Sequence, residues 1–160
     1  MISYADCPRV IALPETEEFL LKSGDFVFAR TGGAGSFGLV EDDHPRAIFA
    51  SYLIRFRFDE SVNTHFLKYL FLSSGFKNGI EMNIHGGVNK NVHAEDIKNQ
   101  YISAPPLIEQ QEIVDYLDIF TRKIQDLIQK SKASIELLKE RRSSLISAAV
   151  TGKIDVREVA

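Results

Sequence analysis

Hydrophobic residues in the last third of the chain repeat at alternating steps of four and three. Apolar or small side chains occupy Ile113, Leu117, Phe120, Ile124, Leu127, Ser131, Ser134, Leu138, Leu145 and Ala148. This spacing is that of a heptad seam along one face of an α-helix. A helix over residues 107–150 would be roughly 65 Å long at 1.5 Å per residue, much longer than a small domain needs. The pattern therefore predicts a helical arm that packs against a partner.

The earlier residues carry the shorter patterns of β-strands. The run at 26–29 is rich in β-formers and follows a turn at 23–25, so it predicts a strand. A glycine-rich stretch comes next at 31–38, and the extended pattern resumes at 39–40. We therefore expect two strands joined by a loop.

A second strand pair is expected at 47–50 and 52–58. In the later run Arg55 and Arg57 alternate with apolar residues, so one face of that strand would be apolar and the other basic. A cationic face of this kind could contact nucleic acid. It is also common where a protein protects an exposed strand, and alone it favours that simpler interpretation.

From residue 62 the apolar spacing changes to three and four, which predicts a helix that ends near 73–75. Residues 76–93 are rich in glycine and asparagine and are expected to form a loop with a short extended piece. A helical turn is predicted at 94–97. A closing strand is predicted at 101–104, before the double proline stops it.

These patterns together predict an α+β protein. Residues 1–104 would form a mixed, β-rich body, residues 105–152 one long coiled-coil-forming α-helix, and residues 153–160 a C-terminal tail. Of the 160 residues 44% are hydrophobic and 26% are charged, which is a folded composition. No apolar run reaches the length of a membrane span, and the N-terminus has no signal-peptide pattern, so we expect a cytoplasmic protein. The single cysteine, Cys7, offers neither a disulfide nor a zinc site.

The net charge of −3 argues mildly against binding to nucleic acid. The acidic residues are clustered at 15–18 and 41–43, however, so a basic face could exist between these clusters. Its candidates are Arg30, Arg46, Arg55, Arg57, Lys77, Lys90 and Lys98.

The sequence offers no catalytic constellation. The glycine-rich stretch lacks the Gly-Lys-Ser/Thr ending and the following helix of a phosphate-binding P-loop. The four histidines match no metal-ligand spacing, and no Gly-x-Ser-x-Gly motif is present. These observations favour a binding module over an enzyme and predict no metal ion and no cofactor.

Two segments have the composition of a DNA contact. The loop residues Arg30, Thr31, Gly32, Gly33 and Ser36 combine small residues, which allow close approach, with hydrogen-bond donors. A later segment supplies amides suited to adenine edges and a lysine suited to phosphates; its candidates are Asn83, Asn89, Lys90 and Asn91. For the loop the alternative is a flexible hairpin, and for the later segment it is a polar surface turn.

Several segments resemble the specificity (S) subunit of type I restriction-modification systems. The strand and loop at 21–32 and the extended segment at 52–58 are similar to parts of that family's target recognition domain. Residues 83–97 resemble the end of that domain, and 105–114, with Pro-Pro-Leu-x-Glu-Gln, resemble the start of its spacer helix. The finish at 145–155, with Ala-Val-Thr-Gly-Lys-Ile, is similar to the C-terminal signature.

The resemblance implies that the protein does no chemistry itself. Family members carry two target recognition domains held apart by antiparallel helices, and each domain reads one half of a split target in double-stranded DNA. They recruit methyltransferase subunits that use S-adenosylmethionine and a restriction subunit that uses ATP. This chain has one recognition domain and one spacer helix, and it begins later in the domain than the family pattern does.

We therefore expect the arm to pair with a second copy or with a second specificity half. The interface is predicted at Leu117, Phe120, Ile124, Leu127, Leu138 and Leu145. Two other functions are compatible with the residues. One is a coiled-coil adaptor that binds proteins and no DNA, and the other is an enzyme that holds a nucleotide in the glycine-rich loop.

Overall fold

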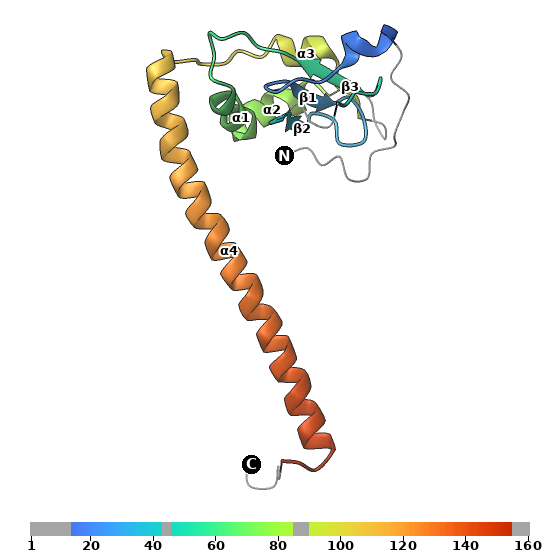
Figure 1. The fold of residues 1–160 in the computed structure, drawn as a ribbon, viewed down its shortest axis with the longest axis vertical. Helices are drawn as coiled ribbons and strands as arrows, with labels where there is room; N and C mark the ends of the chain where they lie inside the picture. Colours follow the sequence, from blue (N-terminus) through green and yellow to red (C-terminus); the bar gives the residue numbers. More distant parts are fainter. Residues whose placement is uncertain (1–13, 43–45, 85–89, 155–160) are drawn as a thin grey trace. The chain divides into compact units, whose positions relative to one another are not determined.

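The computed structural model describes residues 14–42, 46–84 and 90–154. Figure 1 shows a mixed body of short strands and helices and one long C-terminal helix. The elements in chain order are the 3-10 helix η1 (Pro14–Phe19), β1 (Phe26–Ala29), β2 (Phe37–Leu39), β3 (Leu53–Phe56), α1 (Thr64–Leu72), α2 (Ser74–Met82), α3 (Ala94–Lys98) and α4 (Leu107–Val150). The predicted α+β class is confirmed.

The three strands form one antiparallel sheet in the order β2-β1-β3. The register places Phe26 opposite Leu39 and Phe56, and Phe28 opposite Phe37 and Ile54. Because side chains alternate between the faces of a strand, these residues share one face of the sheet. That face is the apolar one.

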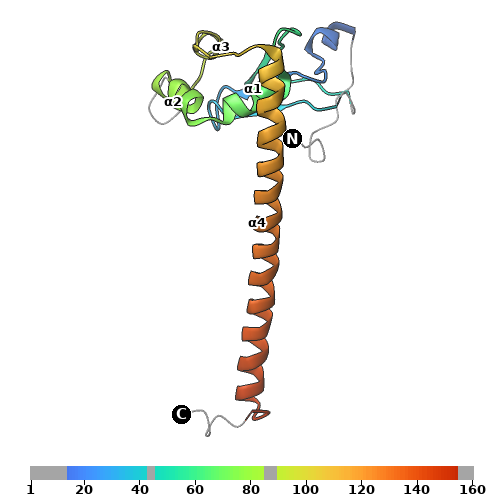
Figure 2. The same ribbon diagram turned by 90° about the vertical axis from the view of Figure 1, so that its left-hand side faces the viewer.

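The helices α1 and α2 supply the other half of the core, and Figure 2 shows both within the same body as the sheet. Phe71 of α1 is the centre of this cluster. Its ring centroid lies 5.0 Å from that of Phe26, 5.4 Å from that of Phe28, 5.5 Å from that of Phe37 and 4.6 Å from that of Phe76. Most of these ring pairs are edge-to-face or tilted, which is the favoured geometry of aromatic contacts.

The opposite face of the sheet carries a smaller cluster and uses Arg55 as part of its packing. Arg55 lies over the ring of Phe49, with 5.1 Å between its Cζ and the ring centroid. Its Nη1 donates to the carbonyl oxygens of Glu18 at 2.9 Å and Leu20 at 3.1 Å. Arg55 thus holds the segment at 18–20, which precedes β1, against the sheet.

Arg57 is also bound within the body, to a fully buried carboxylate. Its Nε and Nη2 donate to the two oxygens of Asp25 at 2.7 and 2.8 Å, and the backbone amide of Lys22 donates to the same carboxylate. The hydrogen bond with Asp25 raises the pKa of Arg57 above its ordinary value. Arg55 and Arg57 therefore stabilise the fold through contacts within the body, a role that neither interpretation of the alternating face predicted.

The prediction of a loop across 76–93 was wrong at its start, because residues 74–82 form α2. Ser73 ends α1 with an extended backbone, and its Oγ accepts from the Phe76 amide as the N-cap of α2. Phe76 and Ile80, four residues apart, are both buried in the core. Their burial outweighs the low helix propensity of the glycines beside them.

Two expected strands are absent from the described residues. Residues 101–104 form no β-pair, and Tyr101 is fully exposed, so this segment has no sheet to join. In the expected strand at 47–50, only an isolated bridge joins Ile48 to Leu20. The helical turn predicted at 94–97 is confirmed by α3.

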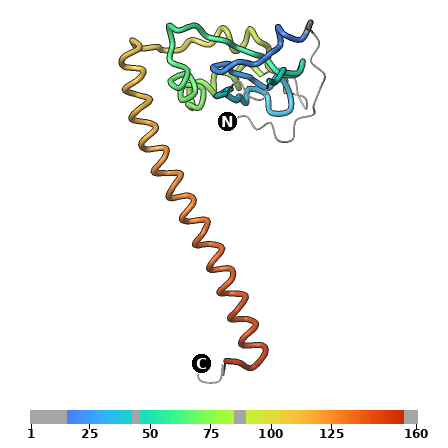
Figure 3. Tube along the Cα trace, viewed as in Figure 1, coloured from blue at the N-terminus to red at the C-terminus, as the bar shows by residue number. Residues whose placement is uncertain are grey.

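The long helix is confirmed, with 44 residues from Leu107 to Val150, and Figure 3 traces it as one continuous element. The chain divides into two compact units, residues 1–114 and 115–160, so the first two turns of α4 belong to the body. Among the described residues, no helix is both long enough and apolar enough to cross a membrane.

Candidate functional site

The loop that follows β1 is held by backbone hydrogen bonds at both ends. The amide of Ala29 donates to the carbonyl of Ser36 at 2.8 Å, and the amide of Gly35 donates to the carbonyl of Ala29 at 3.0 Å. Gly32, Gly33 and Gly35 adopt positive φ angles of 68°, 139° and 84°, a region that side chains disfavour. The glycines of this stretch are therefore required by its backbone path.

Arg30 joins the loop to a segment about sixty residues later. Its amide donates to the Tyr52 carbonyl at 2.9 Å, and its carbonyl accepts from the Val92 amide at 3.0 Å. Val92 is fully buried, whereas Lys90 is exposed. The second bond therefore places residues 90–91 beside the start of the glycine-rich loop.

The two segments together border a depression of about 850 Å³ on the body. Its lining consists of Thr31, Gly32, Gly33, Ala34, Ser36, Glu81, Ile84, Lys90 and Asn91. Six of the nine residues predicted as DNA contacts are in this lining. The depression offers backbone amides, hydroxyl groups, a carboxamide and an ammonium group, which together can bind base edges and phosphate oxygens.

The three other predicted contacts lie in different settings. Arg30 is exposed at the start of the loop. Asn83 ends α2, and its Nδ2 donates to the Gly79 carbonyl at 2.9 Å, so its amide is used within the helix. Asn89 lies outside the described residues.

Glu81 in the lining was not foreseen from the sequence. It lies on the last turn of α2, in a stretch whose composition predicted a loop, and it is exposed. Its carboxylate offsets the positive charge that Lys90 brings to the lining of the depression. The depression can therefore contact bases as well as phosphates, because a carboxylate can accept a hydrogen bond from the amino group of cytosine.

The loop is seated directly on α2 at Gly35. A Cβ atom at Gly35 would lie 2.7 Å from Cγ2 of Ile80, a buried side chain that cannot move aside freely. The absence of a side chain at this position thus allows the loop to approach the helix. The contact sets the height of the loop above α2.

We expect Gly35→Ala to displace the loop, because the new methyl group meets Ile80 and the φ of 84° is strained for alanine. The free energy of unfolding should fall by about 1–3 kcal/mol, and affinity for duplex DNA should fall more than tenfold, on the order of the 1–3 kcal/mol carried by a specific contact. Chemical denaturation and gel shifts measure these effects. Gly75→Ala in α2, where an added Cβ meets nothing within 4 Å, is the matched control and should leave affinity unchanged. Equal affinities for the Gly35 variant and the wild type would contradict a role for the loop in binding.

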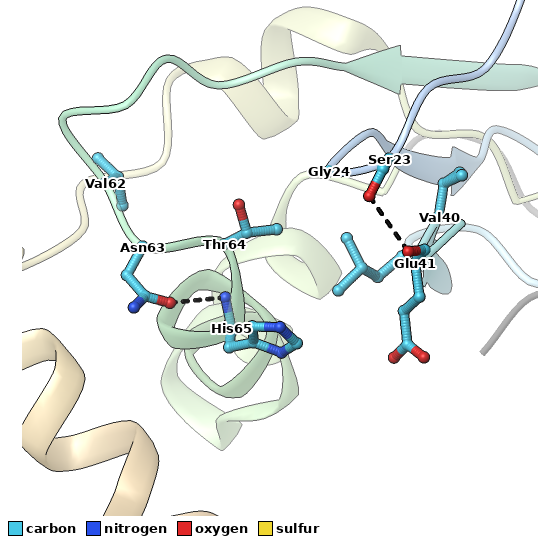
Figure 4. A pocket seen from close by; sticks show the side chains of 9 residues that line it. Ser23, Gly24, Val40, Glu41, Val62, Asn63, Thr64 and His65 are labelled. Carbon is cyan, nitrogen blue, oxygen red and sulfur yellow. Dashed lines mark hydrogen bonds between the residues drawn. The ribbon is translucent and has the colours of Figure 1, made fainter. Parts of the chain in front are cut away.

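A second depression, of about 570 Å³, lies beside the start of α1 (Figure 4). Two of its polar side chains, Ser23 and Glu41, are hydrogen-bonded within the body. Ser23 Oγ donates to the Glu41 carbonyl, and the Glu41 carboxylate accepts from Lys68 Nζ at 3.1 Å. This hydrogen bond lowers the pKa of Glu41. None of the predicted contact residues lies here.

In the described part of the chain, no cluster of three or more His, Cys, Asp or Glu side chains could hold a metal ion.

The residues predicted as the helix interface lie along α4. Leu117 is partly buried, and five others are between 44% and 63% exposed: Phe120, Ile124, Leu127, Leu138 and Leu145. Exposed side chains of this size in a row are typical of a surface that a partner covers. Ile128 and Ile135, which sequence analysis passed over, are also about half exposed. Each directly follows a seam position, so they continue the apolar stripe where Ser131 and Ser134 interrupt the strict heptad.

Comparisons with known proteins give one family model and solved structures with a similar fold. A family model described as "Type I restriction modification DNA specificity domain" matches residues 10–137. A chain from a solved structure described as "Structural basis underlying complex assembly and conformational transition of the type I R-M system" is 21% identical, with a TM-score of 0.68, over 81% of this chain and 31% of that chain. The HsdS subunit from Thermoanaerobacter tengcongensis is 26% identical, with a TM-score of 0.57, over 68% of this chain and 28% of that subunit. The chain thus spans less than a third of the length of either structure. No curated protein sequence matches it significantly.

Proposed function

The chain belongs to the family of type I restriction modification DNA specificity domains, and from this premise we infer that its body reads one half of a bipartite target in double-stranded DNA. The depression beside the glycine-rich loop would be the reading surface. The protein itself would be non-catalytic, and the methylation and cleavage would be carried out by methyltransferase and restriction subunits that dock on it.

One observation supports this location most directly. Two segments were predicted separately as DNA contacts, 30–36 and 83–91. The hydrogen bond from the Val92 amide to the Arg30 carbonyl brings the end of the second, Lys90 and Asn91, beside the first. Their side chains are short or polar and are displayed on a packed core, which is the usual arrangement of a recognition loop on a rigid scaffold. The glycines would allow the DNA backbone to approach closely, while Lys90 would bind phosphate and Asn91 a base edge.

The arm would act as a spacer. Its apolar stripe would pack against a second spacer helix, from another copy of the chain or from a second specificity half. Because DNA has a regular helical repeat, a fixed separation between two recognition bodies corresponds to a fixed number of unread base pairs between half-sites. A pair of identical chains would read a symmetric target.

Selection of bound sites from a random duplex library tests the proposed function. We expect one enriched half-site per body, and two copies in inverted orientation if the chain pairs with itself. Arg30→Ala and Lys90→Ala should each weaken binding to the enriched site and, where they remove a phosphate contact, reduce the slope of log affinity against log salt by about 0.9. Fluorescence anisotropy across a salt series measures both quantities.

Lys22→Ala is the matched control for these variants, because Lys22 precedes β1 whereas Arg30 follows it at the other end of the strand. Its salt slope should equal that of the wild type. The same experiment separates the proposed function from the second candidate, a coiled-coil adaptor, which the exposed stripe on α4 favours. An adaptor would cause no rise in the anisotropy of labelled duplex DNA, even at low salt.

A further inference from the structure

The first two turns of α4 contain a buried polar side chain, Gln110, which is 2% exposed. Its Oε1 accepts from the backbone amide of Asn63 at 2.8 Å, and its Nε2 donates to the carbonyl of Pro105 at 2.7 Å. Val114, four residues later on the same side of the helix, is also buried. A buried amide with both ends bonded is directional, since it loses these bonds if the helix slides or rotates.

Asn63 is bonded to α4 by its side chain as well. Its Nδ2 donates to Oε1 of Gln111 at 2.8 Å. Its Oδ1 accepts from the amides of His65 at 2.9 Å and Phe66 at 3.1 Å, which makes Asn63 the N-cap of α1 (Figure 4). One residue therefore begins α1 and also binds the root of α4. We call the bonds among Asn63, Gln110 and Gln111 the amide clamp.

From the amide clamp, packed side chains lead to the strands that flank the glycine-rich loop. The helix α1 that Asn63 caps buries Leu67 and Phe71 in the core. Phe71 packs against Phe28 of β1 and Phe37 of β2. The loop connects these two strands. The root of α4 and the proposed reading surface are thus parts of one packed unit.

We propose that Gln110 is a positioning residue, which couples the root of the spacer helix to the reading surface so that two half-sites are accepted at one separation only. This inference rests on the proposed function. An apolar contact would hold the root equally well but would tolerate small rotations, whereas the amide clamp specifies one arrangement. A change of one base pair between half-sites rotates one of them by roughly a tenth of a helical turn about the DNA axis. A protein that distinguishes such spacings therefore needs the start of α4 to be fixed on its body.

The test uses duplexes carrying two copies of the selected half-site, separated by a series of lengths that differ by one base pair. We expect wild type to prefer one length over its neighbours by about tenfold or more, as for a mismatched position in a site. Gln110→Met, which keeps the size of the side chain but removes both hydrogen bonds, should reduce this preference to about twofold, while affinity for a single half-site stays within about twofold of wild type. Asn63→Asp keeps the N-cap acceptor and removes only the donor to Gln111, so it should reduce the preference less. Gln125→Met, on the exposed arm, is the control.

Hydrogen exchange of the DNA-free protein gives a second readout. In Gln110→Met the amides of Asn63 and of residues 31–36 should exchange faster, while those of β1 should not. Unchanged exchange at these amides would overturn the coupling between the root of α4 and residues 31–36. Faster exchange with an unchanged preference for one half-site separation would overturn it as well. If the wild type binds no duplex, the proposed function fails, and the exchange of residues 31–36 then decides the coupling alone. Asn63→Asp serves for both measurements if Gln110→Met does not fold.

Discussion

Replacing Phe71 with alanine should lower the free energy of unfolding of the body by about 3–5 kcal/mol, the range for removing a fully packed aromatic side chain. Phe71 is 3% exposed and is in contact with rings from β1, β2 and α2. Removing the ring would leave a cavity between these elements, which adds to the lost transfer free energy. For a body of about a hundred residues, this loss corresponds to a fall in Tm on the order of 15–30 °C.

Thermal unfolding followed by circular dichroism measures this effect, with the near-ultraviolet signal reporting the aromatic core. Tyr101→Ala is the matched control, because Tyr101 is fully exposed and its truncation removes no packing. Its midpoint should stay within about 2 °C of wild type. A Phe71→Ala variant that unfolds at the wild-type temperature would contradict the central place of this ring in the core.

The double variant Ile124→Glu with Leu127→Glu should convert a paired chain into a monomer. Both side chains are more than half exposed on a single chain and belong to the apolar stripe. In a symmetric pair, four such side chains would be covered, each contributing about 1.5–3 kcal/mol, so their loss should weaken association by roughly 10⁴-fold or more. Light scattering at micromolar concentration measures the mass directly.

The control for this variant is Gln125→Glu with Gln129→Glu, which adds the same charge to the same stretch of helix on a different face. Its mass should equal that of wild type. A wild-type chain that is strictly monomeric at the working concentration would count heavily against pairing between two copies. It would favour pairing with a second, different specificity half.

Sequence reasoning succeeded where a pattern was local and repeated. The bounds predicted for the strand at 26–29 match β1, because a short apolar run between turn residues has few alternatives. The arm could be predicted equally well, because its seam repeats over many turns. Its ends are marked by the prolines and by Thr151-Gly152. The loop and the segment at 83–91 were proposed as contacts from composition, but nothing in the sequence required Lys90 and Asn91 to lie beside the loop while Asn83 does not line the depression.

The missed features depend on partners that lie far apart in the chain. The helix α2 contains Gly75 and Gly79, and only the burial of Phe76 and Ile80 against distant strands stabilises it. At Gly79 the space that a Cβ would take is occupied by the side-chain amide of Gln100, another residue far along the chain. Arg57 finds its carboxylate 32 residues away, and Gln110 finds Asn63 47 residues away. Periodicity and propensity carry no information about such pairs.

Three polar residues in the lining of the depression stand apart from the core, which has a consequence for how such proteins diversify. Thr31, Ser36 and Lys90 are exposed and contribute no side chain to the aromatic cluster. Substitutions at such positions usually change stability by less than about 0.5 kcal/mol. Under the proposed function, a lineage could therefore acquire a new DNA target through a few point mutations at these sites, with no intermediate that fails to fold. The glycines between Thr31 and Ser36 would keep the backbone path of the loop unchanged while the exposed side chains differ.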